Sequence, residues 1–347
     1  MIHIYRLRIK KIIEETQDAK SFILENLDKK TLHYHAGQFL TLLFEQTNGT
    51  EVRRSYSISS SPVLDKELAI TVKKIANGEF SRRLADKAKV GDILMSIGAS
   101  GLFTLPTTIK SNDRFCFMAA GSGITPIFSL IKTLLHNNPT TSILLIYSNT
   151  SQSSTIFFNQ LTELRESFQN RFAIEFLFSH STKIFESRLT HSVIDLLIDR
   201  YALYEHNNTI FYLCGPYAYM RMVSIKLRAD GIDAERIKKE LFIIDTPSFK
   251  LVEPPDQEAH EVTIFLNKQR YSIEVKYPTS ILQSAKKRQI PIPYSCENGQ
   301  CGACAALCTK GKVWMRYNEV LGNKALAEGY ILTCTGYPID GPVELTL

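Results

Sequence analysis

Hydrophobic residues in the first hundred positions come in short runs and alternating stretches rather than in long helical patterns. The N-terminal segment, residues 1–10, alternates between apolar and polar side chains, as a half-buried strand does. Further apolar runs have the length of strands, and we expect strands at Leu40–Phe44, Ala69–Val72, Ile93–Ile97 and Phe103–Leu105. The one helix that we expect here covers Ser81–Lys87. Several short strands with one helix predict a small antiparallel β-barrel over residues 1–107.

From residue 108 to residue 247 the pattern changes, because strand-like runs now alternate with helix-like stretches. The expected strands are Arg114–Ala120, Ser142–Ser148, Phe172–Ser179 and Thr209–Cys214. A helix is expected after each strand, beginning at Thr125, at Thr155, near Ser192 and at Pro216. This alternation is typical of an α/β domain whose parallel sheet carries helices on both faces.

Residues 248–260 contain Pro254, Pro255 and several charged side chains, and we expect a linker there. Strand-like runs return at Val262–Leu266 and Tyr271–Val275, and a helical stretch follows near Ser280–Arg288. The pattern predicts a third domain of α+β type over residues 261–347, which is long enough to form a compact core.

The composition is that of a globular protein, with 44% hydrophobic and 22% charged residues. The N-terminal residues lack the apolar core of a signal peptide, and no run of about 18 apolar residues occurs, so we expect a cytoplasmic protein without a membrane span. The formal charge of +6 is small and scattered, and we therefore expect no nucleic-acid partner.

Four cysteines have the spacing of a plant-type iron–sulfur site. Cys296, Cys301 and Cys304 follow the pattern C-x4-C-x2-C, and Cys334 comes after a gap of 29 residues. Structural zinc sites favour two C-x2-C pairs, and disulfides need an oxidising compartment, so we favour a [2Fe–2S] cluster over both. Cys116, Cys214 and Cys308 remain, and an odd remainder indicates free thiols.

Two segments of the first domain have the chemistry of a flavin site. Arg54 and Tyr56 lie two residues apart on a strand and therefore share a face, where Arg54 could bind a pyrophosphate and Tyr56 could pack on a planar ring. Ser57 follows and could hydrogen-bond a ring nitrogen. In the sequence Gly78-Glu-Phe80-Ser81, Ser81 is expected to cap the helix whose first N–H groups attract phosphate. An ordinary surface strand and a plain helix cap remain the alternatives.

Two loops of the second domain follow strands and precede helices. The first is Gly121-Ser-Gly123-Ile-Thr125-Pro126, where glycines let a cofactor approach the backbone and Pro126 suits a first helical turn. The second is Cys214-Gly215-Pro216. In a parallel sheet both loops lie at the carboxyl edge, where dinucleotides bind. Cys214 would face this crevice or, alternatively, act as a small buried apolar residue.

Together these segments resemble the ferredoxin–NADP⁺ reductase superfamily, in the arrangement with a plant-type ferredoxin domain at the C-terminus. The resemblance covers essentially the whole chain, and it is strongest to reductase components of oxygenases of the phenylacetyl-CoA type. The matching positions, in the family's order, are Arg54, Tyr56 and Ser57; Gly78, Phe80 and Ser81; Gly121, Gly123, Thr125 and Pro126; Cys214, Gly215 and Pro216; and Glu240, Leu241 and Phe242.

The resemblance implies a barrel for the flavin, an α/β domain for the nicotinamide and a β-grasp domain for the cluster. It implies that Tyr56 and Ser57 contact the flavin ring and Arg54 its pyrophosphate. It places Thr125 and Cys214 at the nicotinamide, with Glu240 and Phe242 near the flavin; Ser57, Thr125, Cys214 and Glu240 are the expected catalytic residues. The expected flavin is FAD, with FMN as the alternative.

The implied activity is an NAD(P)H-dependent oxidoreductase that passes electrons through the flavin and the cluster to a terminal oxygenase. Other acceptors are alternatives, among them a hybrid-cluster protein, a steroid hydroxylase or a desaturase, and a redox sensor is a further one. NADH and NADPH both remain open, because the expected 2′-phosphate region offers Ser, Thr and His180, with Lys183 and Arg188 nearby. Glu79 occupies a position where the family often has Arg or Lys. Residues 261–347 carry ten Lys and Arg against seven Asp and Glu, a net charge of +3, whereas plant ferredoxins are acidic.

Overall fold

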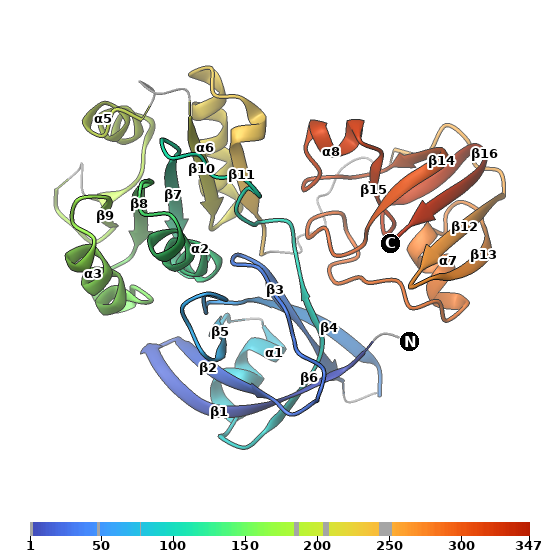
Figure 1. The fold of residues 1–347 in the computed structure, drawn as a ribbon, viewed down its shortest axis with the longest axis horizontal. Helices are drawn as coiled ribbons and strands as arrows, with labels where there is room; N and C mark the ends of the chain where they lie inside the picture. The colour runs from blue at the N-terminus through green and yellow to red at the C-terminus, as the bar shows by residue number, and fades with distance from the viewer. Residues whose placement is uncertain (1–2, 47–48, 77, 184–186, 204–207, 243–251) are drawn as a thin grey trace. The chain divides into compact units, whose positions relative to one another are not determined.

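The computed structural model describes residues 3–46, 49–76, 78–183, 187–203, 208–242 and 252–347. The chain divides into two compact units. One is Ile4–Ile243, and the other, called the C-terminal unit, consists of Ile244–Leu347 together with Met1–His3. The first unit contains an antiparallel sheet and a parallel sheet, and the second contains a mixed sheet (Figure 1).

The antiparallel sheet closes into the expected barrel. Its strands are β1 (Tyr5–Thr16), β2 (Ala19–Asn26), β3 (Phe39–Glu45), β4 (Glu51–Ser57), β5 (Leu68–Lys73) and β6 (Ile93–Ser100). They pair in the order β4-β3-β6-β1-β2-β5, and a bridge between Ile58 and Ile70 joins the two ends of the sheet. Tyr5, Leu7 and Ile9 of β1 point inward while the residues between them are exposed, so the alternation in the sequence matches the strand period.

Two local expectations for the barrel are wrong. The helix begins at Glu79 rather than at Ser81, as α1 (Glu79–Arg82), and continues as the π-helical turn η1 (Arg83–Lys87). The stretch Phe103–Leu105 forms no strand. Phe103 is instead buried edge-on against Tyr212 at a ring distance of 5.2 Å, and the Tyr212 hydroxyl donates to the carbonyl of Thr104 at 2.9 Å. This stretch therefore joins the barrel to the parallel sheet.

The parallel sheet is doubly wound. It consists of β7 (Arg114–Ala120), β8 (Ser142–Asn149), β9 (Phe172–Phe178), β10 (Thr209–Cys214) and β11 (Ile237–Glu240), in the order β11-β10-β7-β8-β9. The chain builds outward from β7 to β8 and β9, and then returns to build β10 and β11 on the other side. The strand order thus reverses between β7 and β10, and ligands bind at such a switch point in open α/β sheets.

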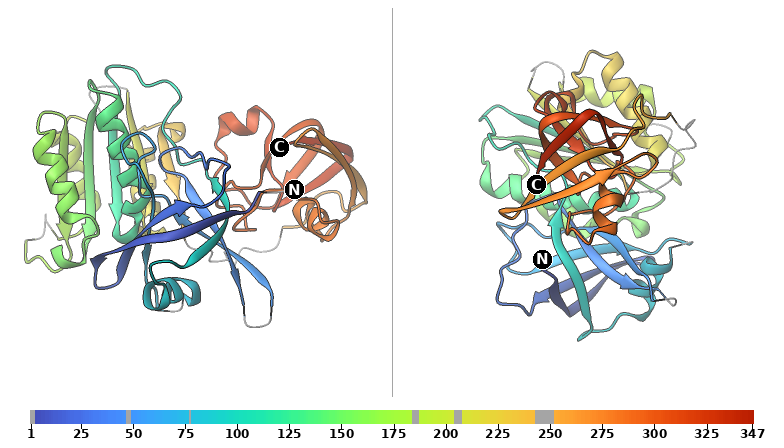
Figure 2. Two further views of the ribbon diagram at one scale, coloured as in Figure 1. Left: turned by 60° about the horizontal axis from the view of Figure 1, so that its bottom comes forward. Right: turned by 90° about the vertical axis from the view of Figure 1, so that its right-hand side faces the viewer.

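Helices cover both faces of this sheet, as predicted (Figures 1 and 2). Phe115 and Phe117 of β7 pack in one core with α2 (Ile124–Asn137) and α3 (Phe158–Ser167). Cys116 and Met118 point the other way, into the core with α5 (His191–Arg200) and α6 (Tyr217–Ala229). Helix α3 begins three residues later than expected, after the short turn η3 (Gln152–Ser154). Across the described residues, each helix is too short or too polar to cross a lipid bilayer.

The C-terminal unit has the expected β-grasp arrangement (Figure 2). Its strands β12 (His260–Leu266), β13 (Gln269–Val275), β14 (Ala305–Met315), β15 (Tyr330–Leu332) and β16 (Gly336–Thr346) pair in the order β13-β12-β16-β14-β15, with β12 and β16 parallel. Helix α7 (Ile281–Lys287) buries Ile281, Leu282 and Ala285 in the core, and α8 (Asn323–Ala327) is a single short turn. Among the described residues of this unit, the hydrophobic core begins at Val262.

The described part of the expected linker is attached to this unit. Asp256 accepts hydrogen bonds from His260 Nε2 at 2.7 Å and from the Asp340 N–H at 2.9 Å. The backbone N–H groups of Glu258 and Asp340, followed by His260, lower the pKa of Asp256 to about 2. Residues 247–251, which include the expected start of the linker, lie outside the described residues.

Candidate functional site

Arg54 and Phe80, both predicted to contact the flavin, meet on the barrel. Arg54 lies on β4, and its guanidinium stands over the Phe80 ring at 5.1 Å from the ring centre. Phe80 lies in α1 and packs against Phe44 at a ring distance of 4.6 Å. A cation above an aromatic face is held by the ring quadrupole. The strand and the helix that the sequence assigns to the flavin therefore present one joint surface.

Tyr56 and Ser57 occupy opposite faces of β4. The Tyr56 ring packs against the barrel core, and its burial raises the pKa of its phenol. Ser57 is buried, and its hydroxyl donates to Glu240 Oε1 at 3.3 Å. The strand thus directs one side chain to the barrel and the next to the end of the parallel sheet.

Ser81 does not cap the helix, which corrects the expectation from the sequence. The residue before the helix is Gly78, which makes no side-chain cap. Ser81 lies inside the first turn, where its buried hydroxyl donates to the Gly78 carbonyl at 3.0 Å. A Cβ at Gly78 would lie 2.3 Å from this hydroxyl, so a larger residue there would force neighbouring side chains to move. A contact of Gly78 and Ser81 with phosphate stays a prediction.

The two loops at the switch point of the sheet interlock through glycines. A Cβ at Gly123 would lie 2.1 Å from the carbonyl oxygen of Cys214, and a Cβ at Gly215 would lie 2.9 Å from the Cβ of Ala120. Real Cβ atoms essentially never come within 3.0 Å of another heavy atom, so these contacts depend on glycine at both positions. The structure therefore brings together the two segments that the sequence assigned to the nicotinamide.

The start of α2 differs slightly from the expectation. Thr125 lies inside the helix rather than at its cap, and its buried hydroxyl donates to the Ser122 carbonyl at 2.9 Å. Pro126 is in the first turn, where its missing N–H costs nothing. Sequence analysis missed Tyr147, whose hydroxyl donates to the Gly121 carbonyl at 2.9 Å and holds the loop. Tyr147 sits in an apolar strand run, which carries no signal for this role.

Glu240 lies at the point where the barrel and the sheet meet. It ends β11 in register with Cys214 at the end of β10. The residue as a whole is only partly buried, but Oε2 of its carboxylate is inaccessible to solvent and has no hydrogen-bond partner among the described residues. Burial raises the pKa of Glu240 to about 8, and the hydrogen bond from Ser57 opposes this shift.

Cys214 is fully buried beside Glu240, and burial, followed by the Glu240 charge, raises the pKa of its thiol. Ser57, Cys214 and Glu240, three of the four predicted catalytic residues, therefore meet in one place. A buried polar oxygen without a partner calls for an explanation, and a bound group with a hydrogen-bonding edge supplies one. The site thus fits a cofactor edge at this point. Phe242, by contrast, is exposed at the end of the described segment.

The four predicted cluster ligands lie as two pairs. The Cys301 thiol hydrogen-bonds Cys296, and the Cys334 thiol hydrogen-bonds Cys304. Each contact lowers the pKa of the accepting thiol, to about 6 for Cys296, and raises the pKa of the donor. Among the described residues, no group of three or more His, Cys, Asp or Glu side chains is arranged to hold a metal ion. Two thiol pairs match a centre of two irons with four cysteine ligands.

The loop that carries these cysteines turns its backbone N–H groups toward the sulfurs. Cys296 accepts from the N–H groups of Asn298 and Gln300, and Cys334 accepts from that of Gly299. Gly299 has a φ of +81°, and a Cβ there would lie 2.7 Å from the carbonyl oxygen of Tyr317. Such N–H donors stabilise anionic sulfur, so the loop has the chemistry that a [2Fe–2S] cluster requires.

Three protein families match successive parts of the chain. Residues 6–105 match the oxidoreductase FAD-binding domain, and residues 117–224 match the oxidoreductase NAD-binding domain. Residues 264–338 match the 2Fe-2S iron-sulfur cluster binding domain. The matches fall on the barrel, the parallel sheet and the β-grasp unit in that order, and they confirm the expected set of cofactors.

Similar proteins cover nearly the whole chain. The ferredoxin reductase component of 3-ketosteroid-9-alpha-monooxygenase from Mycolicibacterium smegmatis is 32% identical over 99% of this chain and 97% of its own. One of the subunits of 1,2-phenylacetyl-CoA epoxidase from Escherichia coli is 30% identical over the same shares. The structure of phthalate dioxygenase reductase aligns with a TM-score of 0.60 at 23% identity, over 99% of this chain and 98% of its own.

The three family matches follow one another along this chain, in the order FAD, nicotinamide and cluster, and the relatives cover the same residues. The length of the match leaves no large part of the chain unaccounted for. The chain therefore belongs to the family of NAD(P)H-dependent reductase components of oxygenase systems, which carry FAD and a [2Fe–2S] cluster.

Proposed function

We propose that the chain transfers a hydride from NAD(P)H to FAD at Ser57, Thr125, Cys214 and Glu240, and then supplies single electrons to a terminal oxygenase. The observation that carries the proposal is the hydrogen bond from Ser57 to Glu240, which joins the flavin strand to the edge of the nicotinamide sheet. When bound, FAD accepts two electrons as a hydride, and the cluster accepts one electron at a time.

The barrel residues hold the flavin in this proposal. Arg54 binds the pyrophosphate, Tyr56 packs on the ring, and the turn formed by Gly78, Phe80 and Ser81 lies against the phosphates. The loops of the sheet border the nicotinamide, and the residues assigned to it are Gly121, Gly123, Thr125, Pro126, Cys214, Gly215 and Pro216. Phe242 completes the flavin side.

Ser57 and Glu240 control protons beside the cofactors. Because the pKa of Glu240 is raised to about 8, its carboxyl is mainly protonated at neutral pH. A neutral carboxyl can donate from one oxygen while the other accepts from Ser57. Burial also keeps the Cys214 thiol protonated, so the crevice presents an uncharged surface to the nicotinamide.

The functional domains in this proposal are residues 1–107 for FAD, 108–247 for NAD(P)H and 261–347 for the cluster, with 248–260 as the linker. Cys296, Cys301, Cys304 and Cys334 ligate the cluster. A reducing compartment suits the chain, since none of its seven cysteines, all among the described residues, forms a disulfide, and we infer a cytoplasmic location.

Anaerobic stopped-flow spectroscopy tests the proposal. Oxidised flavin absorbance should bleach on mixing with NADH or NADPH, and cluster absorbance should follow. Ser57→Ala removes the donor to Glu240, and we expect a fall of ten-fold or more in the rate of flavin bleaching with FAD content preserved. A wild-type protein that holds FAD but shows no bleaching with either nucleotide contradicts the proposed function. An unchanged rate in Ser57→Ala contradicts the role of Ser57.

The acceptor has two leading candidates. The monooxygenase relative favours a steroid-hydroxylating oxygenase, and the epoxidase relative favours an oxygenase that acts on an aromatic acyl-CoA; the two identities, 32% and 30%, are too close to choose between them. Purified oxygenase components of both kinds should be compared for NAD(P)H consumption that depends on their substrate. The partner is the oxygenase component that forms one molecule of product for each molecule of NAD(P)H consumed.

A further inference from the structure

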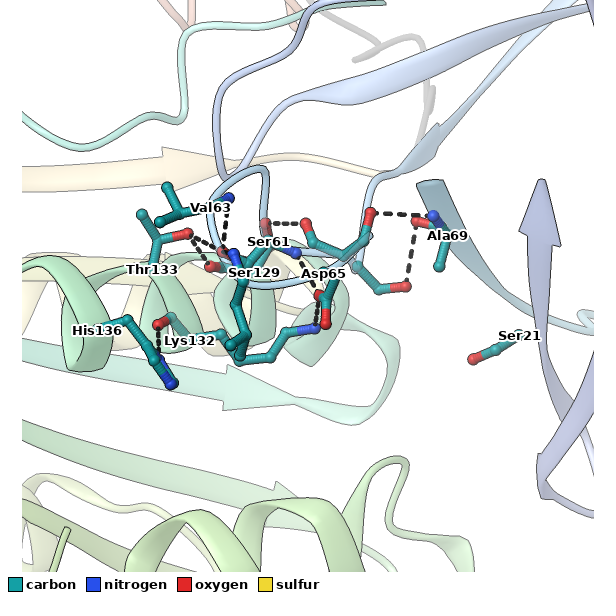
Figure 3. Close-up of polar contacts among 12 residues, drawn as sticks. Ser21, Ser61, Val63, Asp65, Ala69, Ser129, Lys132, Thr133 and His136 are labelled. Atoms are coloured by element: carbon teal, nitrogen blue, oxygen red, sulfur yellow. Dashed lines mark hydrogen bonds and ion pairs between the residues drawn. The ribbon is translucent and has the colours of Figure 1, made fainter. Parts of the chain in front are cut away.

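Helix α2 carries a polar stripe on the side that faces the barrel. Ser129, Lys132 and Thr133 are buried, although the rest of the helix is strongly apolar. All three contact the loop between β4 and β5, which follows the strand that carries Ser57 (Figure 3). The same helix begins at the loop assigned to the nicotinamide. The stripe therefore connects the segment that carries Ser57 to the helix that begins at the nicotinamide loop. It does so at residues that are not assigned to either cofactor.

The centre of this contact is an ion pair between Lys132 Nζ and Asp65 Oδ2 (Figure 3). The same Asp65 oxygen also accepts from the Ser61 N–H at 2.6 Å, which fixes the carboxylate within its own loop. The Lys132 ammonium stands 4.5 Å above the centre of the Phe128 ring. Lys132 is thus held by its own helix on one side and by the barrel loop on the other.

Two neutral hydrogen bonds flank the ion pair. The Ser129 hydroxyl donates to the Ser60 carbonyl at 2.6 Å, and the hydroxyls of Ser61 and Thr133 lie 2.8 Å apart. Ser129 and Thr133 are one helical turn apart, with Lys132 between them in sequence. The loop between β4 and β5 is therefore attached to α2 at three positions within one helical turn, which fixes its position along the helix axis.

Burial of a lysine is costly, and stability alone does not explain why it stands here. Only 9% of Lys132 is exposed, and burial lowers the pKa of its ammonium against the opposing effect of Asp65. Apolar side chains of similar volume often replace buried ion pairs with no loss of stability. A charged pair instead adds specificity for one register of the loop along α2, because the two charges are paired in that register and unpaired in any other.

We propose that Asp65 and Lys132 are positioning residues that set the flavin strand against the nicotinamide loop for hydride transfer. The inference rests on the proposed site. Asp65 follows Ser57 by eight residues, and Lys132 follows Thr125 by seven residues, or two helical turns of about 10 Å. A shift of the loop along α2 would therefore displace Ser57 relative to Thr125. Displacements of about 1 Å cost roughly 100-fold in rate when two reactants must align.

Three variants and a matched control test the inference in the full-length protein. Lys132→Met removes the charge and keeps the volume, Asp65→Asn removes the other charge, and Lys132→Arg keeps the charge. Lys10→Met is the control, because Lys10 pairs with Glu67 at the other end of the same loop but links it only to the barrel. Each protein is characterised by FAD content, cluster absorbance, hydrogen exchange of the α2 amides and the rate of flavin bleaching at saturating NAD(P)H.

For Lys132→Met and Asp65→Asn, we expect the saturating rate to fall ten-fold or more with FAD content unchanged and with faster amide exchange in α2. A fourth variant that combines Lys132→Met with Asp65→Asn should be no slower than either single variant, since both substitutions remove the same contact. Lys132→Arg should recover most of the rate, and Lys10→Met should match the wild type.

Three results overturn the inference. The first is a saturating rate within two-fold of wild type in both single variants. The second is a loss of FAD or of folding in both, which makes the pair structural. The third is an equal loss of rate in Lys10→Met. A wild-type flavin that NAD(P)H does not bleach would instead refute the proposed function, so the two failures are distinguishable.

Discussion

At the scale of single residues, the site combines buried groups that remain neutral. Glu240 has one carboxylate oxygen bonded to Ser57 and one buried without a partner among the described residues. Its neighbour Cys214 is fully buried. A charge on either group would be poorly solvated, which is why burial raises the pKa of both. In the proposed function, these surroundings place no fixed charge beside the cofactor edge.

The raised pKa of Glu240 predicts a pH-dependent stability. Between pH 4.5 and about 8 the folded protein keeps the Glu240 proton while the unfolded chain loses it, so stability falls as pH rises. The slope is at most about 1.4 kcal/mol per pH unit. In Glu240→Gln this contribution disappears. Thermal unfolding of the flavin-free proteins by circular dichroism should show equal melting temperatures near pH 4.5 and a more stable variant at pH 8.5. A difference that stays constant with pH contradicts the prediction.

At the scale of elements, the meeting of the β7 and β10 loops depends on glycine. In Gly123→Ala the new methyl group would lie 2.1 Å from the Cys214 carbonyl oxygen, so one of the loops must move. We expect a destabilisation of about 1–3 kcal/mol and at least a ten-fold weaker affinity for NAD(P)H, with FAD retained by the barrel.

Titration of the protein with NADP⁺ and NAD⁺, followed by flavin difference spectra, measures this affinity. Gly322→Ala is the control, because its Cβ would meet no atom within 4 Å and its φ is −75°. Wild-type affinity in Gly123→Ala would show that the loops can separate without harm to the site.

The elements also show what the sequence can predict. The limits of β7 and β10 match the expectation at both ends, because each is an apolar run bounded by polar or turn residues. The expectation at Ser81 is wrong, since its hydroxyl bonds back to Gly78 inside the turn. Barrel closure at Ile58 and Ile70 and the pair of Asp65 with Lys132 join distant positions. No local pattern encodes such contacts, because their partners are selected by tertiary packing.

In the candidate site too, some features follow from a local sequence pattern and others only from tertiary packing. Three of the four predicted cluster cysteines share one loop at a characteristic spacing, and the structure brings all four together as two pairs, while their ligation of a cluster stays a prediction. Glu240 was expected near the flavin only from the resemblance. Its neighbours in the sequence, Lys238 and Lys239, are charged, and they give no sign that its carboxylate is buried. Its raised pKa arises from β11, β10 and the end of β4, which come together only in the folded unit.

At the scale of the whole molecule, the chain separates its chemistry into units with independent cores. The clusters of buried residues in Ile4–Ile243 and in the C-terminal unit share no members. This division suits a relay in which one unit handles paired electrons and the other handles single ones. It also implies that the loss of the iron–sulfur centre leaves the flavin unit folded.

Replacement of one cluster ligand tests this independence. Cys334→Ala breaks the pair with Cys304 and removes one of four thiolate ligands, so cluster absorbance should be lost. Flavin bleaching by NAD(P)H should stay within two-fold of wild type, because Cys334 contributes to the core of the C-terminal unit alone. Reduction of a protein acceptor should fall at least 100-fold. Cys308→Ala is the matched control, since its half-buried thiol lies outside the two pairs. Slow flavin bleaching in Cys334→Ala with normal FAD content would mean that the two units depend on each other. The cluster would then affect hydride transfer to the flavin as well as electron transfer to the acceptor.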